Sequence, residues 1–67
     1  MNNKHWRANK GEFYYYIVDL IFSTSYVDER SLDDDFNYKI GNYFKTKEQD
    51  DKVAKEIENI LNKHKND

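Results

Sequence analysis

Apolar residues toward the C-terminal end of the chain recur at the three- and four-residue spacing of a helix that buries one side. Within residues 47–63 the apolar positions are Val53, Ala54, Ile57, Ile60 and Leu61. Thr46 precedes this stripe, and Gln49 stands three positions further on, the spacing of a capping box. The pattern predicts an amphipathic helix over 47–63, with Ile57 as its main contact with the core.

Upstream, the pattern is typical of strands. Residues 4–8 and 12–18 are predicted to form a hairpin around a turn at 9–11, which contains a glycine. Successive side chains of the second strand point to opposite faces, and both faces carry aromatic rings. Either this strand is central and covered on both faces, or one row of tyrosines forms a contact surface. Residues 20–26 have the composition of a further strand, and 27–33 read as a loop.

A short helix is predicted over 34–40, where Phe36 and Ile40 lie four residues apart. Ser31 or Asp33 is suited to cap its start, and Gly41 stands where a left-handed residue often ends a helix.

The expected fold class is therefore α+β. Three to four short antiparallel strands form a small sheet, including a brief strand at residues 43–44. The long terminal helix packs on one face of this sheet, and the short helix lies near 34–40. The chain reads as a single domain over residues 1–67, with 1–3 and 63–67 frayed.

Composition narrows the setting. The chain has 67 residues, close to the lower size limit for one self-sufficient core, and no cysteine, so no disulfide or thiolate metal site is expected. Its longest apolar stretch, Phe13 to Phe22, is far shorter than the ~20 residues of a membrane span. The N-terminus has no apolar segment of the signal-peptide type. We expect a soluble protein in the cytoplasm of a bacterial host cell, without membrane contact.

Catalytic and metal chemistry find little support in the residues. The two histidines, His5 and His64, lie near opposite ends of the chain and belong to no triad pattern. Hard cations need carboxylates that converge on one point, whereas the run at 33–35 diverges at the start of a helix. We expect no catalytic residue, no metal site and no cofactor, and hence no enzyme.

A resemblance supplies a biological setting. The segment Trp6-Arg7-Ala8, the tyrosine-rich residues 12–17 and the block Gly41-Asn42-Tyr43-Phe44-Lys45-Thr46-Lys47-Glu48 resemble a group of small, uncharacterised phage and prophage proteins of low-GC Gram-positive bacteria. The likeness covers roughly residues 6–61. The chain departs from the group at residues 18–22, where those proteins have a turn with glycine and this one has none. The resemblance implies a phage protein and assigns no catalytic residue.

Charge and aromatic content then favour a binding protein. Residues 28–35 carry a net charge of −4, residues 1–11 carry +3, and the chain as a whole −2. Tyrosine, tryptophan and arginine dominate the centres of protein interfaces. We therefore expect a non-enzymatic protein that binds and inhibits a bacterial host protein by steric occlusion, most sharply an anti-defence inhibitor of the anti-CRISPR kind. Its expected partner-binding residues are Tyr14, Tyr16, Tyr26, Asp28, Glu29, Asp33, Asp34 and Asp35.

Two alternatives remain open. A small nucleic-acid-binding regulator would use the basic and aromatic N-terminus, through Lys4, Trp6, Arg7 and Lys10. The net negative charge makes nucleic acid the less favoured partner. A structural, self-associating domain is the third possibility, because a homodimer would enlarge the small core.

Overall fold

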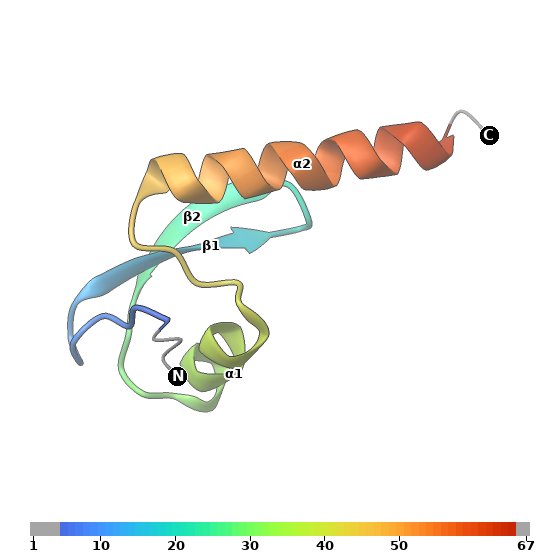
Figure 1. The fold of residues 1–67 in the computed structure, drawn as a ribbon. Coiled ribbons are helices and arrows are strands. Elements are labelled where there is room, and N and C mark those ends of the chain that lie inside the picture. Colours follow the sequence, from blue (N-terminus) through green and yellow to red (C-terminus); the bar gives the residue numbers. More distant parts are fainter. Residues whose placement is uncertain (1–4, 66–67) are drawn as a thin grey trace.

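A computed structural model describes residues 5–65 of the chain. Its elements are strands β1 (Phe13–Val18) and β2 (Phe22–Val27) and helices α1 (Leu32–Ile40) and α2 (Lys47–Lys65). The two strands form an antiparallel sheet, with α2 packed along one face and α1 lying on the other side (Figure 1). The α+β class and the long terminal helix are thus confirmed. Neither helix in the described part of the chain is long and apolar enough to cross a membrane.

The hairpin lies further along the chain than the sequence predicts. Strand β1 pairs with β2, in a register that sets Tyr14 opposite Tyr26 and Val18 opposite Phe22. The turn that joins them is residues 19–21, so the strand predicted at 20–26 begins later, at Phe22. The first two residues of this turn, Asp19 and Leu20, have φ values of 51° and 76°, the left-handed conformation usually taken by glycine.

The predicted pairing of residues 4–8 with 12–18 is wrong for the residues described, because 5–8 form no strand. The turn at 9–11 does form, with the Glu12 N–H donating to the Asn9 carbonyl (2.9 Å). The chain before it packs inward instead, and Ala8 is buried beside Tyr43. The free edge of β1 is occupied by Phe44, whose backbone exchanges two hydrogen bonds with Tyr15 (2.8 and 2.9 Å).

The segment between the helices completes that edge without forming a strand. Two residues further along β1 than the Tyr15–Phe44 bridge, the Asn42 side chain accepts a hydrogen bond from the Ile17 N–H (2.7 Å) and donates one to the Ile17 carbonyl (2.9 Å). The side-chain amide thus takes the place of a backbone amide. The described residues contain two strands and one isolated bridge, and the predicted three to four strands are not confirmed.

Both helix starts follow capping rules. Ser31 caps α1 in a capping box with Asp34, and Gly41 ends the helix with φ 88°, as predicted. At α2 the Thr46 hydroxyl accepts from the Gln49 N–H (3.2 Å). The Gln49 side chain accepts from the N–H of Lys45, one residue before the cap (3.3 Å).

The apolar stripe of α2 is only partly covered. Ala54 is buried, Ile57 is half-buried, and Ile60 and Leu61 are 56% and 47% exposed. The helix outruns the sheet, and its C-terminal half projects beyond the hairpin (Figure 1). Ile57, predicted as the main contact of this helix with the core, is less buried than Ala54. The buried apolar side chains are Ala8, Tyr14, Tyr43 and Ala54.

Candidate protein-binding face

The polar side of helix α1 faces the rest of the protein. The Tyr14 hydroxyl donates to Asp34 (2.7 Å) and accepts from the Asn37 amide (3.3 Å). One position further on, the Tyr38 hydroxyl donates to the His5 carbonyl (2.7 Å) and its ring stacks on the His5 imidazole. Because residues 34, 37 and 38 share one side of a helix, these contacts fix the rotation of α1 about its axis.

The apolar side of α1 consequently faces solvent. Leu32, Phe36 and Ile40 follow one another at intervals of four, and they are 88%, 60% and 57% exposed. A surface helix normally buries such a stripe. We call these three residues the outward stripe. An apolar row of this extent at the surface is typical of an interaction site.

Acidic residues flank the outward stripe. Asp33 and Asp35 lie on α1 itself, and Glu29 lies in the segment that leads into it; all three are exposed. The Asp35 carboxylate accepts a hydrogen bond from Arg7 (2.6 Å). These are the members of the predicted acidic set that a partner can reach.

Asp28 and Asp34 belong to the interior, so their predicted place on a contact surface is wrong. The Asp28 carboxylate is fully buried and accepts from Arg7 (2.9 Å) and from the Tyr43 hydroxyl (2.6 Å), and Arg30 lies 2.8 Å away. Burial alone would raise the pKa of Asp28, but these hydrogen bonds outweigh it and hold the pKa well below its usual value. Asp28 is therefore an anion that ties the N-terminal segment to the sheet.

Asp34 has the same character. Burial tends to raise its pKa, and hydrogen bonds from Tyr14, the Glu29 N–H and Ser31 lower it further than burial raises it. The carboxylate joins the start of α1 to β1 and to the preceding loop. One sequence pattern points to this role, since Ser31 and Asp34 have the spacing of a capping box.

The predicted tyrosines divide in the same way. Tyr14 is 1% exposed and stacks on Tyr43 at 4.1 Å, so it is a core residue and not a contact residue. Burial raises the pKa of Tyr43 to about 12, with its bond to Asp28 acting in the same direction. Tyr16 is half-buried, and Tyr26 is 56% exposed on the sheet face that Tyr14 also points to. Tyr26 is the one predicted tyrosine that is largely accessible.

The basic and aromatic N-terminus is also rearranged. The Arg7 guanidinium is held by Asp28 and Asp35, and its bond to Asp28 is the main reason that its pKa is raised. Lys10 is exposed in the turn, and Lys4 lies outside the described residues. Trp6 is half-buried and borders a shallow depression of about 500 Å³, whose rim includes Lys45 and Lys52.

The two histidines lie in different parts of the fold. His5 stacks on Tyr38 at 4.9 Å, and His64 is exposed in the last turn of α2. Among residues 5–65, no three histidine, aspartate or glutamate side chains converge so as to hold a metal ion.

The candidate contact residues that the sequence did not indicate are the apolar ones of α1. Leu32 falls in the segment predicted as a loop, 27–33, and the four-residue spacing of Phe36 and Ile40 served only to predict the helix. The available clue was the sequence Ser31-Leu32-Asp33-Asp34, whose capping-box spacing places Leu32 at the first helical position, in line with Phe36.

No protein-family model, no curated protein and no solved structure matches this chain.

Proposed function

We propose that this chain is a non-enzymatic binding protein that inhibits a bacterial host protein by placing the outward face of α1 on it. The observation that carries the proposal is the outward stripe, Leu32, Phe36 and Ile40, exposed along one side of a capped helix and flanked by carboxylates. The resemblance to phage proteins supports the host setting. An anti-defence role, of the anti-CRISPR kind, is the sharpest form of this proposal.

The chemistry of the face defines the partner. An amphipathic helix that presents anchors at i, i+4 and i+8 docks into an apolar groove of another protein. Asp33 and Glu29 beside the anchors favour a groove with lysine or arginine on its rim. Surfaces of this kind occur where host proteins hold nucleic acid, so occupation of the groove would exclude the nucleic acid.

The local structure favours a ready-made binding element. Ser31 and Gly41 fix both ends of α1, and Tyr14 and Tyr38 fix its rotation. The helix therefore loses little conformational freedom when it binds, which raises affinity. The exposed ring of Tyr26, just upstream of α1 in sequence, is suited to widen the contact.

Capture from a nuclease-treated host lysate tests the proposal. The bait protein, its Phe36→Glu variant and an Asn59→Glu control are compared. Phe36 is 60% exposed, so a carboxylate there leaves the fold intact, which circular dichroism verifies. Asn59 is exposed on α2, and the control adds the same charge away from α1. We expect the parent and control to retain one host protein that Phe36→Glu loses. Retention by all three baits would refute the role of this face.

The acidic residues are tested by kinetics on the partner so identified. Changing Glu29 to Gln and Asp33 to Asn removes two exposed charges and leaves the buried carboxylates in place. We expect slower association with little change in dissociation, and a smaller dependence of the association rate on salt, because charges at the rim of an interface steer encounter. Faster association by this double variant would contradict a basic partner.

The depression beside Trp6 supports a second candidate, the binding of single-stranded nucleic acid. The half-buried indole of Trp6, with Lys45 and Lys52 lining the same depression, can stack a base and contact a phosphate. Trp6 is the single tryptophan of the chain, so its fluorescence reports directly on this site. Quenching by a short single-stranded DNA, weakened by salt and by changing both lysines to glutamine, would favour this function. An unchanged spectrum would exclude stacking on Trp6.

A further inference from the structure

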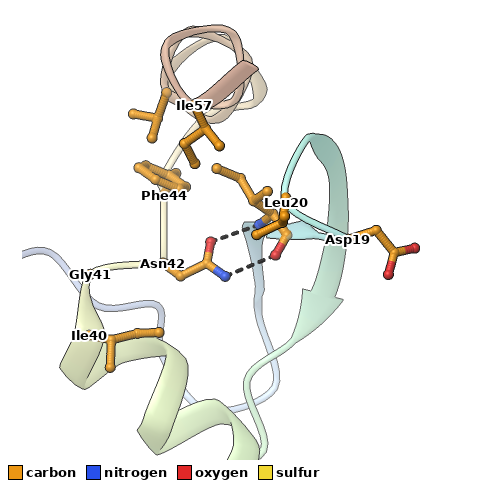
Figure 2. A pocket seen from close by; sticks show the side chains of 9 residues that line it. Asp19, Leu20, Ile40, Gly41, Asn42, Phe44 and Ile57 are labelled. Carbon is orange, nitrogen blue, oxygen red and sulfur yellow. Dashed lines mark hydrogen bonds between the residues drawn. The ribbon is translucent and has the colours of Figure 1, made fainter. Parts of the chain in front are cut away.

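An apolar groove is lined by the segment that joins the two helices, through Gly41, Asn42 and Phe44. It occupies about 490 Å³ between the C-terminal end of α1, the hairpin turn and α2. Figure 2 shows Ile57 and Phe44 on the α2 side, Leu20 on the hairpin side and Ile40 at the end of α1. The Asn42 amide, bonded to the backbone of Ile17, lies between them and holds the segment after α1 against β1 (Figure 2).

An apolar ridge, formed by Ile60 and Leu61 of α2, continues from this groove. Ile60 follows Ile57 by three residues and Leu61 follows it by four, so both continue the side of α2 that lines the groove. The C-terminal half of α2 extends beyond the hairpin (Figure 1), and Ile60 and Leu61 each have about half of their surface exposed. The surface therefore offers an apolar hollow and an apolar protrusion next to each other.

We propose that this groove binds a second copy of the chain, with the C-terminal half of one α2 lying antiparallel along the groove of the other. A twofold interface uses the same patch on both partners, so the patch must be complementary to itself. A hollow and a ridge side by side along one helix satisfy this condition, because each copy inserts Ile60 and Leu61 where the other is hollow. Of the three residues of the outward stripe, only Ile40 lines this groove.

Charge favours one relative direction of the two helices. The exposed acidic residues near the start of α2 are Glu48 and Asp51, with Lys47 and Lys52 beside them, and basic residues gather at its end, at Lys63, His64 and Lys65. An antiparallel pair brings the basic end of each helix toward the acidic start of the other. A parallel pair would set bases against bases and acids against acids, which is unfavourable.

The area needed is available. A stable interface buries about 800 Å² on each partner, which is roughly 15% of the 5250 Å² surface of this chain. Beyond Ile60 and Leu61, the hairpin turn contributes Leu20 and Ile21, which are 62% and 37% exposed. Leu20 lines the groove, and the other exposed apolar side chains would add to the area that a second copy covers.

The conformation of Leu20 is an independent sign of a role for this turn. A leucine at φ 76° costs free energy that glycine at the same place would not. In the monomer its side chain is 62% exposed, so packing within the chain offsets little of that cost. A docked second copy would cover it, which explains what the strained leucine contributes.

Sedimentation equilibrium over a range of protein concentrations tests the proposal. We expect the parent to dimerise, Ile60→Glu to weaken dimerisation by roughly tenfold or more, and Asn59→Glu to leave it unchanged. Asn59 precedes Ile60 but lies on another side of the helix, so it controls for added charge. A parent that stays monomeric at every concentration, or a dimer that Ile60→Glu does not weaken, would overturn the proposal.

Charge exchange tests the antiparallel direction. One variant changes Lys63 and Lys65 to Glu, and a second changes Glu48 and Asp51 to Lys. Each alone sets like charges together and should dimerise less well than the parent. Their mixture restores both attractive pairs, so we expect heterodimers in preference to either homodimer. Absence of rescue in the mixture would refute the antiparallel arrangement.

Leu20→Gly gives a result that no purely structural role of Leu20 predicts. Relief of the strained φ should raise the stability of the monomer, whereas loss of the side chain should weaken the dimer. A variant that is less stable as a monomer, or one that dimerises as well as the parent, would contradict the role given to Leu20. Phe36→Glu, which removes partner binding in the proposed function, should leave dimerisation unchanged, so the two proposals can fail separately.

Discussion

The two faces of the small sheet are built on different principles. On the α1 side the buried side chains are mostly polar, and the hydroxyls and carboxylates pair through hydrogen bonds: Tyr14 donates to Asp34, and Tyr43 donates to Asp28. On the α2 side the contact is apolar and incomplete. Within residues 5–65, Ala54 is its one buried apolar residue, and one carboxylate oxygen of the buried Asp50 has no hydrogen-bond partner there.

This difference indicates which layer of the fold is closed within the chain and which is not. A closed hydrogen-bond network with stacked rings specifies its geometry within a single chain. A half-covered apolar stripe gains stability only when something else covers it. The α1 layer therefore holds the fold and presents the outward stripe, while the α2 layer is the one that we propose a second copy completes.

The largest expected effect is on the α1 side. Asp28→Ala leaves the charges of Arg7 and Arg30 and the hydroxyl of Tyr43 without their common acceptor, and should cost about 3–5 kcal/mol in the free energy of unfolding. Urea denaturation measures it. Asp33→Ala, which removes an exposed carboxylate, should change stability by less than about 0.5 kcal/mol. Equal effects of the two variants would contradict the network.

An intermediate effect is expected on the α2 side. A fully buried isoleucine loses about 2–5 kcal/mol on truncation to alanine, and Ile57 is half-buried, so Ile57→Ala should cost about 1–2 kcal/mol in the monomer. Ile60→Ala should cost far less in dilute solution, where the second copy is absent. Thermal unfolding at low concentration compares them. A larger loss for Ile60 would mean that the stripe packs within the chain.

The smallest effect concerns pH. Burial raises the pKa of Asp50, against a weaker opposing bond from Ser23, whereas the pKa values of Asp28 and Asp34 are lowered. The stabilising contribution of Asp28 and Asp34 is present above the unfolded pKa of about 3.9 and is lost as pH falls through their folded values. Asp50 has the opposite sign: protonation as pH falls through its raised folded pKa stabilises the fold.

Asp50→Asn isolates that term. At neutral pH the variant should be at least as stable as the parent, because it removes a buried charge, and the two stability curves should converge as the pH falls toward the unfolded pKa. Denaturation at a series of pH values gives both curves. A parent that is more stable than Asp50→Asn at neutral pH, by a margin that shrinks on acidification, would show that the charged form of Asp50 is favoured in the fold, against this account.

The parts of the fold that follow from local rules could be predicted. Thr46 with Gln49 marked the start of α2, and Gly41 marked the end of α1. The hairpin was misplaced because its turn, at Asp19 and Leu20, uses left-handed residues that are not glycine, and no composition rule identifies these. The edge of β1 was misassigned because a side-chain amide, that of Asn42, extends the pairing in place of a strand.

The candidate site could be predicted only in part, because burial inverts the usual expectation for residue types. The exposed Glu29, Asp33 and Tyr26 were identified, but three of their predicted companions, Tyr14, Asp28 and Asp34, are core residues. The sequence shows that tyrosines and aspartates are abundant, and their pairing across 15 to 20 positions depends on the tertiary fold. The outward turn of Leu32 and Phe36 follows from that pairing and was therefore missed as well.

Amide hydrogen exchange at low and high protein concentration tests the contrast between the two layers most directly. If a second copy completes the α2 layer, protection of the amides around Ile57, Ile60 and Leu61 should increase with concentration by more than that of Tyr14 and Tyr43. Protection in β1 would then respond only as far as dimerisation raises global stability. Protection of α2 that does not change with concentration, or that changes no more than that of the tyrosine core, would contradict the account.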